Sequence, residues 1–226
     1  MVDEAKKANR AVLFVDGSNF YHGLKKASAT GLGHLDFAKV ALKLVGPRTW
    51  VELRYYVGQV SQSGNTALYA HQRAFVDRQK KLDSRISFHF GRLETRSSES
   101  DAAKELLEYL AGLKTKIDAA VYKELVELGK RHKRTATVVE KAVDVMLAVD
   151  LVVLAERDVY DTAYILSADG DYTPAVKHVR ERMKKKVFGV AASNGHQLAS
   201  AVDSFIGIDA SWVSDCYITP PSIRHR

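Results

Sequence analysis

The chain has 226 residues, of which 46% are hydrophobic, a composition typical of a globular protein with a substantial core. It contains no run of about 18 apolar residues that would span a membrane. The single cysteine, Cys216, excludes an internal disulfide and a cysteine-rich metal site. The charged start lacks the apolar segment of a secretory signal, so a cytoplasmic location is the default expectation.

The chain is basic, with a net charge of +7 and a pI of about 9.3, which indicates a polyanionic partner. One run of positive charge lies at residues 130–134 and a second at residues 180–186. Either run alone fits a solvated helix end equally well, but two runs in one chain favour a phosphate backbone. The residues that we expect to contact RNA are Lys130, Arg131, Lys133, Arg134, Lys184, Lys185 and Lys186.

The first part of the chain alternates strand and helix patterns. The apolar run at residues 11–15 predicts a buried strand that stops at Asp16, and Ser18 could cap a helix over residues 19–27. The next predicted elements are helices at residues 36–45 and 66–82 and strands at residues 50–60 and 86–93.

Residues 94–137 differ from the rest in composition. They open with a loop-like segment, ETRSSESD, and continue with helical patterns at residues 104–113 and 117–128. This region predicts a helical insertion of one or two helices that ends in the first basic run. The elements predicted after it are a strongly apolar helix at 138–155, a strand at 162–166, a helix at 173–185, a strand at 187–191, a short helix at 197–202 and a last short strand at 205–208.

Strands that alternate with helices imply a mainly parallel sheet covered on both faces, which is a doubly wound α/β/α sandwich. We expect a single domain over residues 1–226, with residues 94–137 inserted into it. In such sheets ligands bind at the carboxyl ends of the strands. Candidate functional residues are therefore those that directly follow the predicted strands.

Four carboxylates are the strongest candidates for chemistry. Asp16 follows the first strand, and Asp169 and Asp171 follow the strand at residues 162–166, so all three can meet at one edge of the sheet. Asp144 lies at the border of an apolar helix stripe, from which a side chain can reach that edge. Crowded carboxylates repel one another unless a cation lies between them. Oxygen ligands alone favour Mg or Mn over zinc.

Each carboxylate also has an ordinary explanation. An aspartate after a strand commonly forms a turn or caps a helix, which applies to Asp16 and Asp171. A single aspartate at a helix border, such as Asp144, is usually just solvated. Four carboxylates aimed at one edge of a basic chain make these explanations less satisfactory when they are taken together.

Other residues near this edge allow two interpretations each. Asn19 could occupy the first helical turn or orient a metal ligand, and Ser167 could be a strand-end hydroxyl or a donor to the metal site. Lys141 could pair with Asp144 or meet a substrate phosphate. Asp150 falls within the apolar stripe, so it needs either a structural hydrogen bond or a role in the metal site. Two tyrosines that flank the acidic residues, Tyr21 and Tyr172, could stack on a base.

Four segments carry a resemblance to a known family. VLFVDGSNFYHGL, EKAVDVMLAVDLV, ILSADGDYTPAVKHVRERMKKKVFGVA and LASAVDSFI resemble, in order and spacing, the NYN domain, a branch of the PIN-like nucleases. The family usually has S-G-D-G-D-F in the third segment, where this chain has Ala168 and Tyr172 at the variable places. The resemblance implies a PIN-like fold and metal-dependent cleavage of RNA, with Asp16, Asp144, Asp169 and Asp171 as the acidic site. It also implies that Asn19, Lys141 and Asp150 occupy family-typical positions.

The sequence therefore predicts a ribonuclease, in which Mg or Mn activates a water that attacks a phosphodiester bond of RNA, with single-stranded RNA as the expected form. The alternative is a non-catalytic RNA-binding or regulatory adaptor with the same basic surface. A haloacid-dehalogenase-like phosphatase fits less well, since that family needs D-x-D after the first strand, whereas Gly17 and Ser18 follow Asp16 here. Neither G-x-G-x-x-G nor a P-loop motif is present, which disfavours a nucleotide-binding Rossmann domain.

Overall fold

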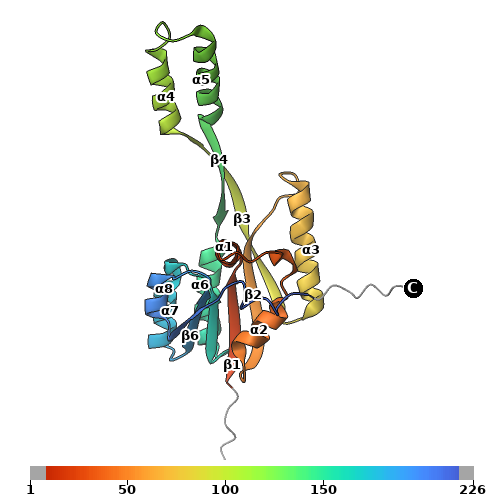
Figure 1. Cartoon of the computed structure of the whole chain (residues 1–226). Helices are drawn as coiled ribbons and strands as arrows, with labels where there is room; N and C mark the ends of the chain where they lie inside the picture. Colours follow the sequence, from red (N-terminus) through yellow and green to blue (C-terminus); the bar gives the residue numbers. More distant parts are fainter. Residues whose placement is uncertain (1–8, 219–226) are drawn as a thin grey trace, which may run out of the picture. The chain divides into compact units, whose positions relative to one another are not determined.

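A computed structural model describes residues 9–218, with the side chains of residues 96–99 and 134–137 left outside the description. Seven strands form one sheet in the order β4-β3-β2-β1-β5-β6-β7 (Figure 1). The strands are β1 (Arg10–Asp16), β2 (Thr49–Gln59), β3 (Ile86–Glu99), β4 (Arg134–Lys141), β5 (Thr162–Leu166), β6 (Lys186–Ala191) and β7 (Ser204–Gly207). The α-helices are α1 (Gly17–Lys26), α2 (Phe37–Val45), α3 (Thr66–Leu82), α4 (Asp101–Ala111), α5 (Ala119–His132), α6 (Val143–Glu156), α7 (Thr173–Glu181) and α8 (His196–Ala201).

The sheet has a hydrophobic core on each face because side chains alternate along a strand. On β1, Leu13 and Val15 pack into the core under α1 and α2, whereas Val12 and Phe14 pack into the core under α6, α7 and α8. All of these side chains are fully buried. The helices lie on both sides of the sheet (Figure 1). The predicted doubly wound α/β/α sandwich is confirmed.

The order of the strands places a switch point beside β1. From β1 the chain builds outward through β2 and β3 on one side, and through β5, β6 and β7 on the other. The pairs β1–β2, β1–β5, β2–β3, β5–β6 and β6–β7 are all parallel. The connections that follow β1 and β5 therefore leave the same edge of the sheet toward opposite sides. Doubly wound folds bind their ligands at such a point.

Leu93–Glu140 form a compact unit of their own. This unit consists of α4 and α5, together with β4 up to Glu140 and the part of β3 beyond Arg92. The segment predicted as a loop, ETRSSESD, instead continues β3 as far as Glu99. None of the helices in residues 9–218 has the length and apolarity that a bilayer crossing requires.

The helix predicted at residues 138–155 is wrong in its first part. Residues up to Lys141 belong to β4, and α6 begins only at Val143. Ala142 separates the two elements with a φ of 72°, a left-handed conformation that ends the strand and starts the helix. Val138 and Val139 are β-branched and suit an edge strand, so their apolar character was misleading about the type of element.

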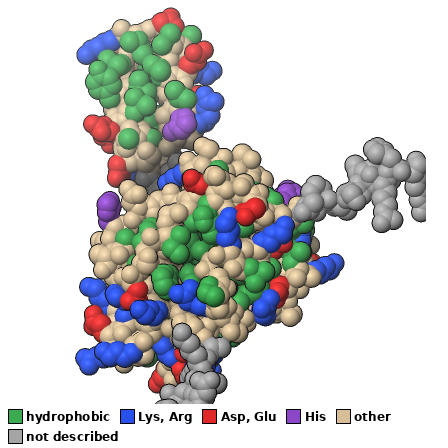
Figure 2. All heavy atoms as spheres, turned by 60° about the horizontal axis from the view of Figure 1, so that its bottom comes forward, with side chains coloured by type: hydrophobic (Ala, Val, Ile, Leu, Met, Phe, Trp, Pro, Cys, Tyr) green, Lys and Arg blue, Asp and Glu red, His purple; other side chains and the backbone are tan. Residues whose placement is uncertain are grey.

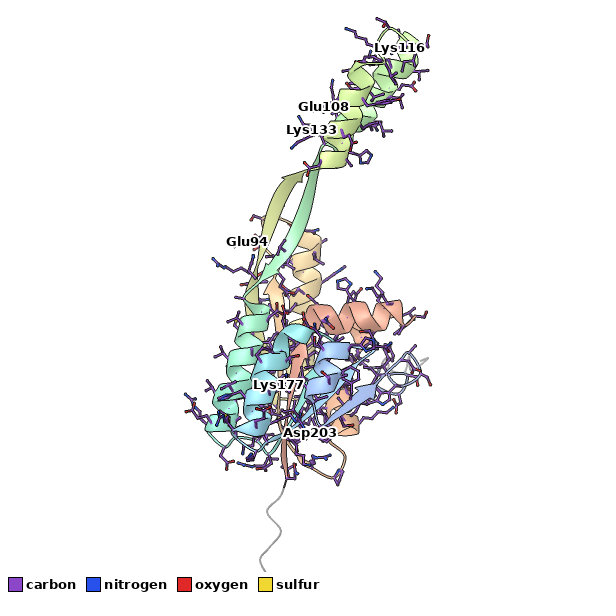
Figure 3. All side chains as sticks on the ribbon, turned by 90° about the vertical axis from the view of Figure 1, so that its left-hand side faces the viewer. Glu94, Glu108, Lys116, Lys133, Lys177 and Asp203 are labelled. Atoms are coloured by element: carbon purple, nitrogen blue, oxygen red, sulfur yellow. The ribbon has the colours of Figure 1, made fainter. Side chains whose placement is uncertain are left out.

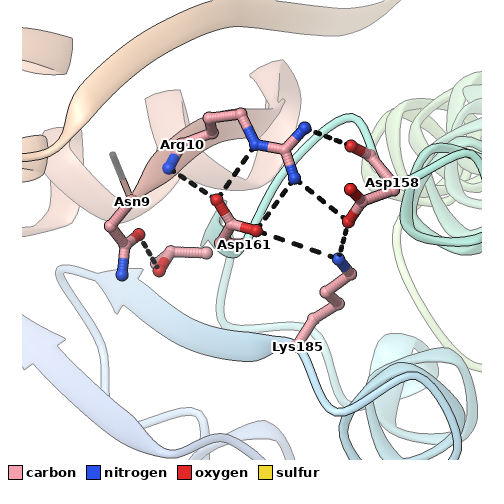
Figure 4. Close-up of polar contacts among 6 residues, drawn as sticks. Asn9, Arg10, Asp158, Asp161 and Lys185 are labelled. Carbon is pink, nitrogen blue, oxygen red and sulfur yellow. Dashed lines mark hydrogen bonds and ion pairs between the residues drawn. The ribbon is translucent and has the colours of Figure 1, made fainter. Parts of the chain in front are cut away.

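The amino edge of the sheet is held by an ion-pair network (Figure 4). Arg10 donates from its backbone and side chain to Asp161, which precedes β5. Arg10 also pairs with Asp158, and Lys185 pairs with Asp158 at 2.5 Å. The Arg10 guanidinium lowers the pKa of Asp161 to about 2. The network ties the starts of β1, β5 and β6 together, at the opposite edge from the switch point.

Candidate metal site

Asp16 is the most buried member of the site. It ends β1 and caps α1, because its Oδ1 accepts a hydrogen bond of 3.0 Å from the Asn19 backbone N–H. Its Oδ2 accepts hydrogen bonds from Ser167 Oγ at 3.2 Å and from the Tyr172 hydroxyl at 3.1 Å. Asp16, and not Ser18, is therefore the cap of this helix. The capping and ligand interpretations of Asp16 are compatible, since the two oxygens have different partners.

Asp169 lies on the loop after β5. It caps a short 3-10 helix, Gly170–Tyr172, by accepting a hydrogen bond of 2.9 Å from the Asp171 backbone N–H. Gly170 lets the loop pack closely on α8, since a Cβ at this position would lie 2.0 Å from the Oε1 of Gln197 and would displace that side chain. The Asn19 Oδ1 accepts a 2.9 Å hydrogen bond from the Ala168 N–H, which joins this loop to α1. The loop is thus fixed from both sides.

Asp144 is the third member of the cluster, and it comes from α6, on the face of the sheet opposite α1. It is exposed in the first turn of α6, where the helix dipole favours a negative charge. Asp16, Asp144 and Asp169 each offer a carboxylate oxygen, and these atoms lie within 4.8 Å of one another, the one such acidic group in the part of the chain that the structure describes. The two strand ends and the helix start therefore converge as the sequence predicted for these three residues.

Tyr172 lies beneath the cluster. Its hydroxyl is 3.1 Å from Asp16 Oδ2 and 3.0 Å from Asp144 Oδ1, and a hydroxyl has only one proton to donate. Burial, followed by the two nearby carboxylates, raises the pKa of Tyr172 above its ordinary value, so the proton stays on the hydroxyl. The hydroxyl can therefore donate to only one of the two carboxylates at a time, which leaves net negative charge at the cluster. Three carboxylate oxygens are ligands of the kind that Mg or Mn binds.

The interpretation in which Tyr172 stacks on a base is wrong. Its side chain is buried, because the ring packs into the core with Val176 and Leu198. Tyr21 is 42% exposed and lies in edge contact with His22, so its stacking on a base stays a prediction. Sequence reasoning missed the hydroxyl of Tyr172. The one available signal was the tyrosine itself, at a place where the resembled family usually has phenylalanine.

The other predicted residues have four different outcomes. Asn19 and Ser167 contact the acidic cluster as described above. Asp171 is exposed and is not a member of the three-carboxylate group. Asp150 accepts a 2.7 Å hydrogen bond from the Tyr56 hydroxyl and lies 3.5 Å from Arg54. It therefore joins α6 to β2, which is the structural hydrogen bond that the sequence allowed. Lys141 ends β4, and among the described residues no ion pair joins it to Asp144.

The two basic runs lie in different places. Lys130, Arg131 and Lys133 lie at the end of α5, as Lys133 shows in Figure 3, and the side chain of Arg134 is outside the described part. Residues 184–186 precede or begin β6, so they are at the amino edge of the sheet, opposite the acidic cluster. Lys185 is already paired with Asp158. The structure therefore does not bring this second run to the acidic cluster, and its contact with RNA stays a prediction.

A basic residue that sequence reasoning missed lies beside the site. A groove of about 480 Å³ is lined by Gly170, Asp171, Thr173, Pro174, Lys177, Gln197 and Ser200. It starts at the loop that carries Asp169 and continues to Lys177, which lies one turn into α7 (Figure 3). Lys177 lies three residues before Arg180, where the second basic run begins, so charge clustering did not single it out.

We expect Asp16→Asn to stabilise the metal-free protein at neutral pH. Burial raises the pKa of Asp16 to about 6, so the folded state favours the protonated form. The contribution of Asp16 to wild-type stability is therefore fully present below about pH 4 and is lost as the pH rises through about 6. Asn carries no charge and still accepts the Asn19 N–H. In chelator, the free energy of unfolding of the variant should exceed that of wild type by up to about 3 kcal/mol at pH 8.

The measurement is urea unfolding of both proteins at pH 4 and pH 8 in chelator. The difference should be small at pH 4, where the wild-type carboxyl is protonated in the folded state and little of the electrostatic cost of burying its charge remains. A difference of the same size at both pH values would contradict an electrostatic cause and would assign the effect to packing.

Comparison with known proteins assigns the chain to a family. The model of the NYN domain matches residues 10–209. No curated protein matches the chain. A solved structure of a Vibrio parahaemolyticus protein of unknown function has a TM-score of 0.56 and 17% identity, and covers 92% of this chain and 97% of that chain, which supports the fold alone. A structure from work on Sir2 enzymes has a TM-score of 0.34 and 12% identity over 92% of this chain and 89% of that chain, too low to support an argument.

Proposed function

Because the chain belongs to the NYN domain family of PIN-like nucleases, we propose that it is a metal-dependent ribonuclease that cleaves phosphodiester bonds of RNA. The observation that carries the proposal is the group of three carboxylates at the switch point, whose oxygens lie within 4.8 Å of one another. We further propose that the chain is a single domain in which residues 94–137 are an insertion, and that it acts in the cytoplasm.

In this proposal Asp16, Asp144 and Asp169 hold Mg or Mn, and exposed Asp171 has a lesser role at the rim. When bound, a divalent ion supplies a more acidic water as nucleophile and positive charge beside the phosphate. The residues of the chain fix the geometry. Ser167 and Tyr172 orient the Asp16 carboxylate, and Asn19 holds the loop that carries Asp169.

The substrate strand needs positive charge near the carboxylates, because the phosphates and the acidic cluster repel each other. Lys177 lines the groove that begins at Gly170 and Asp171. We propose that a phosphate of the RNA lies in this groove, with its charge balanced by Lys177. We also propose that the basic end of α5 contacts RNA.

The proposal is tested by incubating labelled single-stranded RNA with the wild-type protein in manganese, magnesium or chelator. Cleavage should require a divalent ion and stop when chelator is added, since the carboxylates alone provide no nucleophile. The control is the same protein with calcium, which prefers more ligands and longer bonds than this group provides. Cleavage that persists in excess chelator would rule out metal dependence.

A further inference from the structure

A pocket of about 550 Å³ opens at the carboxyl end of β2, on the face of the sheet that α1 and α3 cover. Its lining residues all lie outside the compact unit Leu93–Glu140. The proposed phosphate groove at Lys177 shares none of them. Small-ligand sites in proteins have volumes of about 300–1,000 Å³, so the pocket has the size of a binding site.

Aromatic rings form the walls of this pocket. Phe20 is buried on α1, and Phe75 on α3 packs against Tyr55 of β2 with ring centroids 5.6 Å apart. At the mouth, the side chains of Tyr21 and Leu68 are 42% and 49% exposed. An exposed ring of this kind stacks on nucleobases without regard to their identity, because every base has a π-face.

The polar groups of the pocket suit a ligand that carries acceptors and negative charge. Arg78 and two histidines line the pocket, and no carboxylate is among its described lining residues. Arg78 donates from Nη2 to the Gly33 carbonyl at 2.6 Å, but its Nε is buried and has no hydrogen-bond partner within residues 9–218. A buried donor without a partner is costly, so an occupant that supplies an acceptor is favoured. Lys25 adds positive charge, since its Nζ lies 6.0 Å from the centroid of the Tyr21 ring.

The pocket lies beside the acidic cluster. Helix α1 begins directly after Asp16, and the ring of Tyr55 packs so closely on Gly17 that a Cβ there would overlap it. At about 1.5 Å per residue, Tyr21 lies about 8 Å along α1 from Asp16. The groove at Lys177 borders the same cluster from the opposite face of the sheet, where α7 and α8 lie. A strand with a phosphate in that groove is therefore led across the cluster toward the pocket.

We propose that this pocket binds one unpaired base of the RNA, stacked on Tyr21, with Arg78 as donor to the base and Lys25 beside its phosphate. The inference rests on the proposed function, since it takes RNA as the ligand, and it adds the feature that selects a single strand. A base inside a duplex is already stacked and paired, so it enters such a pocket only after extrusion. The pocket therefore discriminates against duplex RNA, which contacts to phosphates alone do not.

The test measures binding by fluorescence anisotropy in chelator, so that cleavage does not interfere. The labelled probes are a single-stranded RNA, the same strand without its bases and a duplex of the same sequence. Tyr21→Ala should weaken binding of the single strand about 10-fold and leave the affinity for the other two probes unchanged. Tyr21→Phe keeps the ring and should bind all probes as wild type does. The melting temperature should stay unchanged, because Tyr21 is partly exposed.

Tyr109→Ala is the matched control. Tyr109 is 68% exposed on α4, in the hairpin whose visible face carries hydrophobic side chains in Figure 2, and it does not line the pocket. This variant should keep the wild-type preference for the strand with bases over the strand without them.

A second variant examines the interior of the pocket. Arg78→Lys keeps the charge and removes the Nε donor, so it should weaken binding of the single strand alone by about 5-fold. A loss in Tyr21→Ala without one in Arg78→Lys would place the base outside the pocket and overturn the proposal. Equal affinity of wild type for the strands with and without bases would also overturn it, and would leave the proposed function intact. A wild type that binds no RNA would overturn the proposed function and this inference with it.

Discussion

Asp169→Asn is expected to reduce the cleavage of single-stranded RNA in manganese by at least about 1,000-fold. The change removes one of three charged oxygen ligands and leaves the turn intact, since an Asn side chain can still accept the Asp171 N–H. Loss of a group that stabilises charge in the transition state commonly costs about 100- to 1,000-fold, and loss of metal affinity adds to it. The rate should be measured at saturating RNA, together with the melting temperature.

Two controls make this result interpretable. Asp77→Asn changes the same charge on the exposed side of α3 and should leave the rate at the wild-type value. Asp171→Asn should have an intermediate effect, because Asp171 is close in sequence and outside the three-carboxylate group. Full activity of Asp169→Asn, with a normal melting temperature, would remove Asp169 from the proposed site.

The second large effect is expected from the basic end of α5. Replacing Lys130, Arg131, Lys133 and Arg134 by Ala should weaken RNA binding about 10- to 100-fold at low salt. The slope of log affinity against log salt should fall by up to about 3, since each contact with a single strand releases about 0.7 of a counterion. The chemical step, measured with RNA in excess, should stay similar. Binding is measured by fluorescence anisotropy at several salt concentrations.

A matched change distinguishes a local contact from general charge. Lys80 and Lys81 are exposed in the last turn of α3, and replacing both by Ala also removes positive charge. This double variant should change the salt slope less than the pair Lys130→Ala and Arg131→Ala. Equal effects of the two pairs would mean that the run in α5 is an ordinary solvated helix end.

Much of the site follows from the positions of strands in the sequence. Asp16 and Asp169 each follow a buried apolar run, and the ends of parallel strands share one edge, so their proximity could be predicted. The same logic explains why Lys184, Lys185 and Lys186 lie elsewhere. They precede β6, and residues before a parallel strand lie at the opposite edge. A cluster of charge along the sequence does not show whether its residues precede or follow a strand.

The remainder depends on tertiary structure. The start of α6 could not be located by hydrophobicity, because Val138 and Val139 suit an apolar helix and an edge strand alike. The contact of the Tyr172 hydroxyl with both Asp16 and Asp144 joins residues that are 156 and 28 positions apart, and no local pattern encodes it. The proposed role of Lys177 rests on the groove that it lines, which the sequence does not show.

A comparison of wild type with Asp144→Asn tests the central claim most directly. Asp144 is exposed, so its replacement should not disturb the core. Labelled single-stranded RNA would be titrated with each protein in manganese and in chelator, and cleavage assayed in parallel. The nuclease account predicts that wild type cleaves in manganese and that Asp144→Asn has lower manganese affinity and lower turnover. Absence of wild-type cleavage with every divalent metal, together with tighter RNA binding by Asp144→Asn, would contradict it and identify a non-catalytic RNA-binding protein.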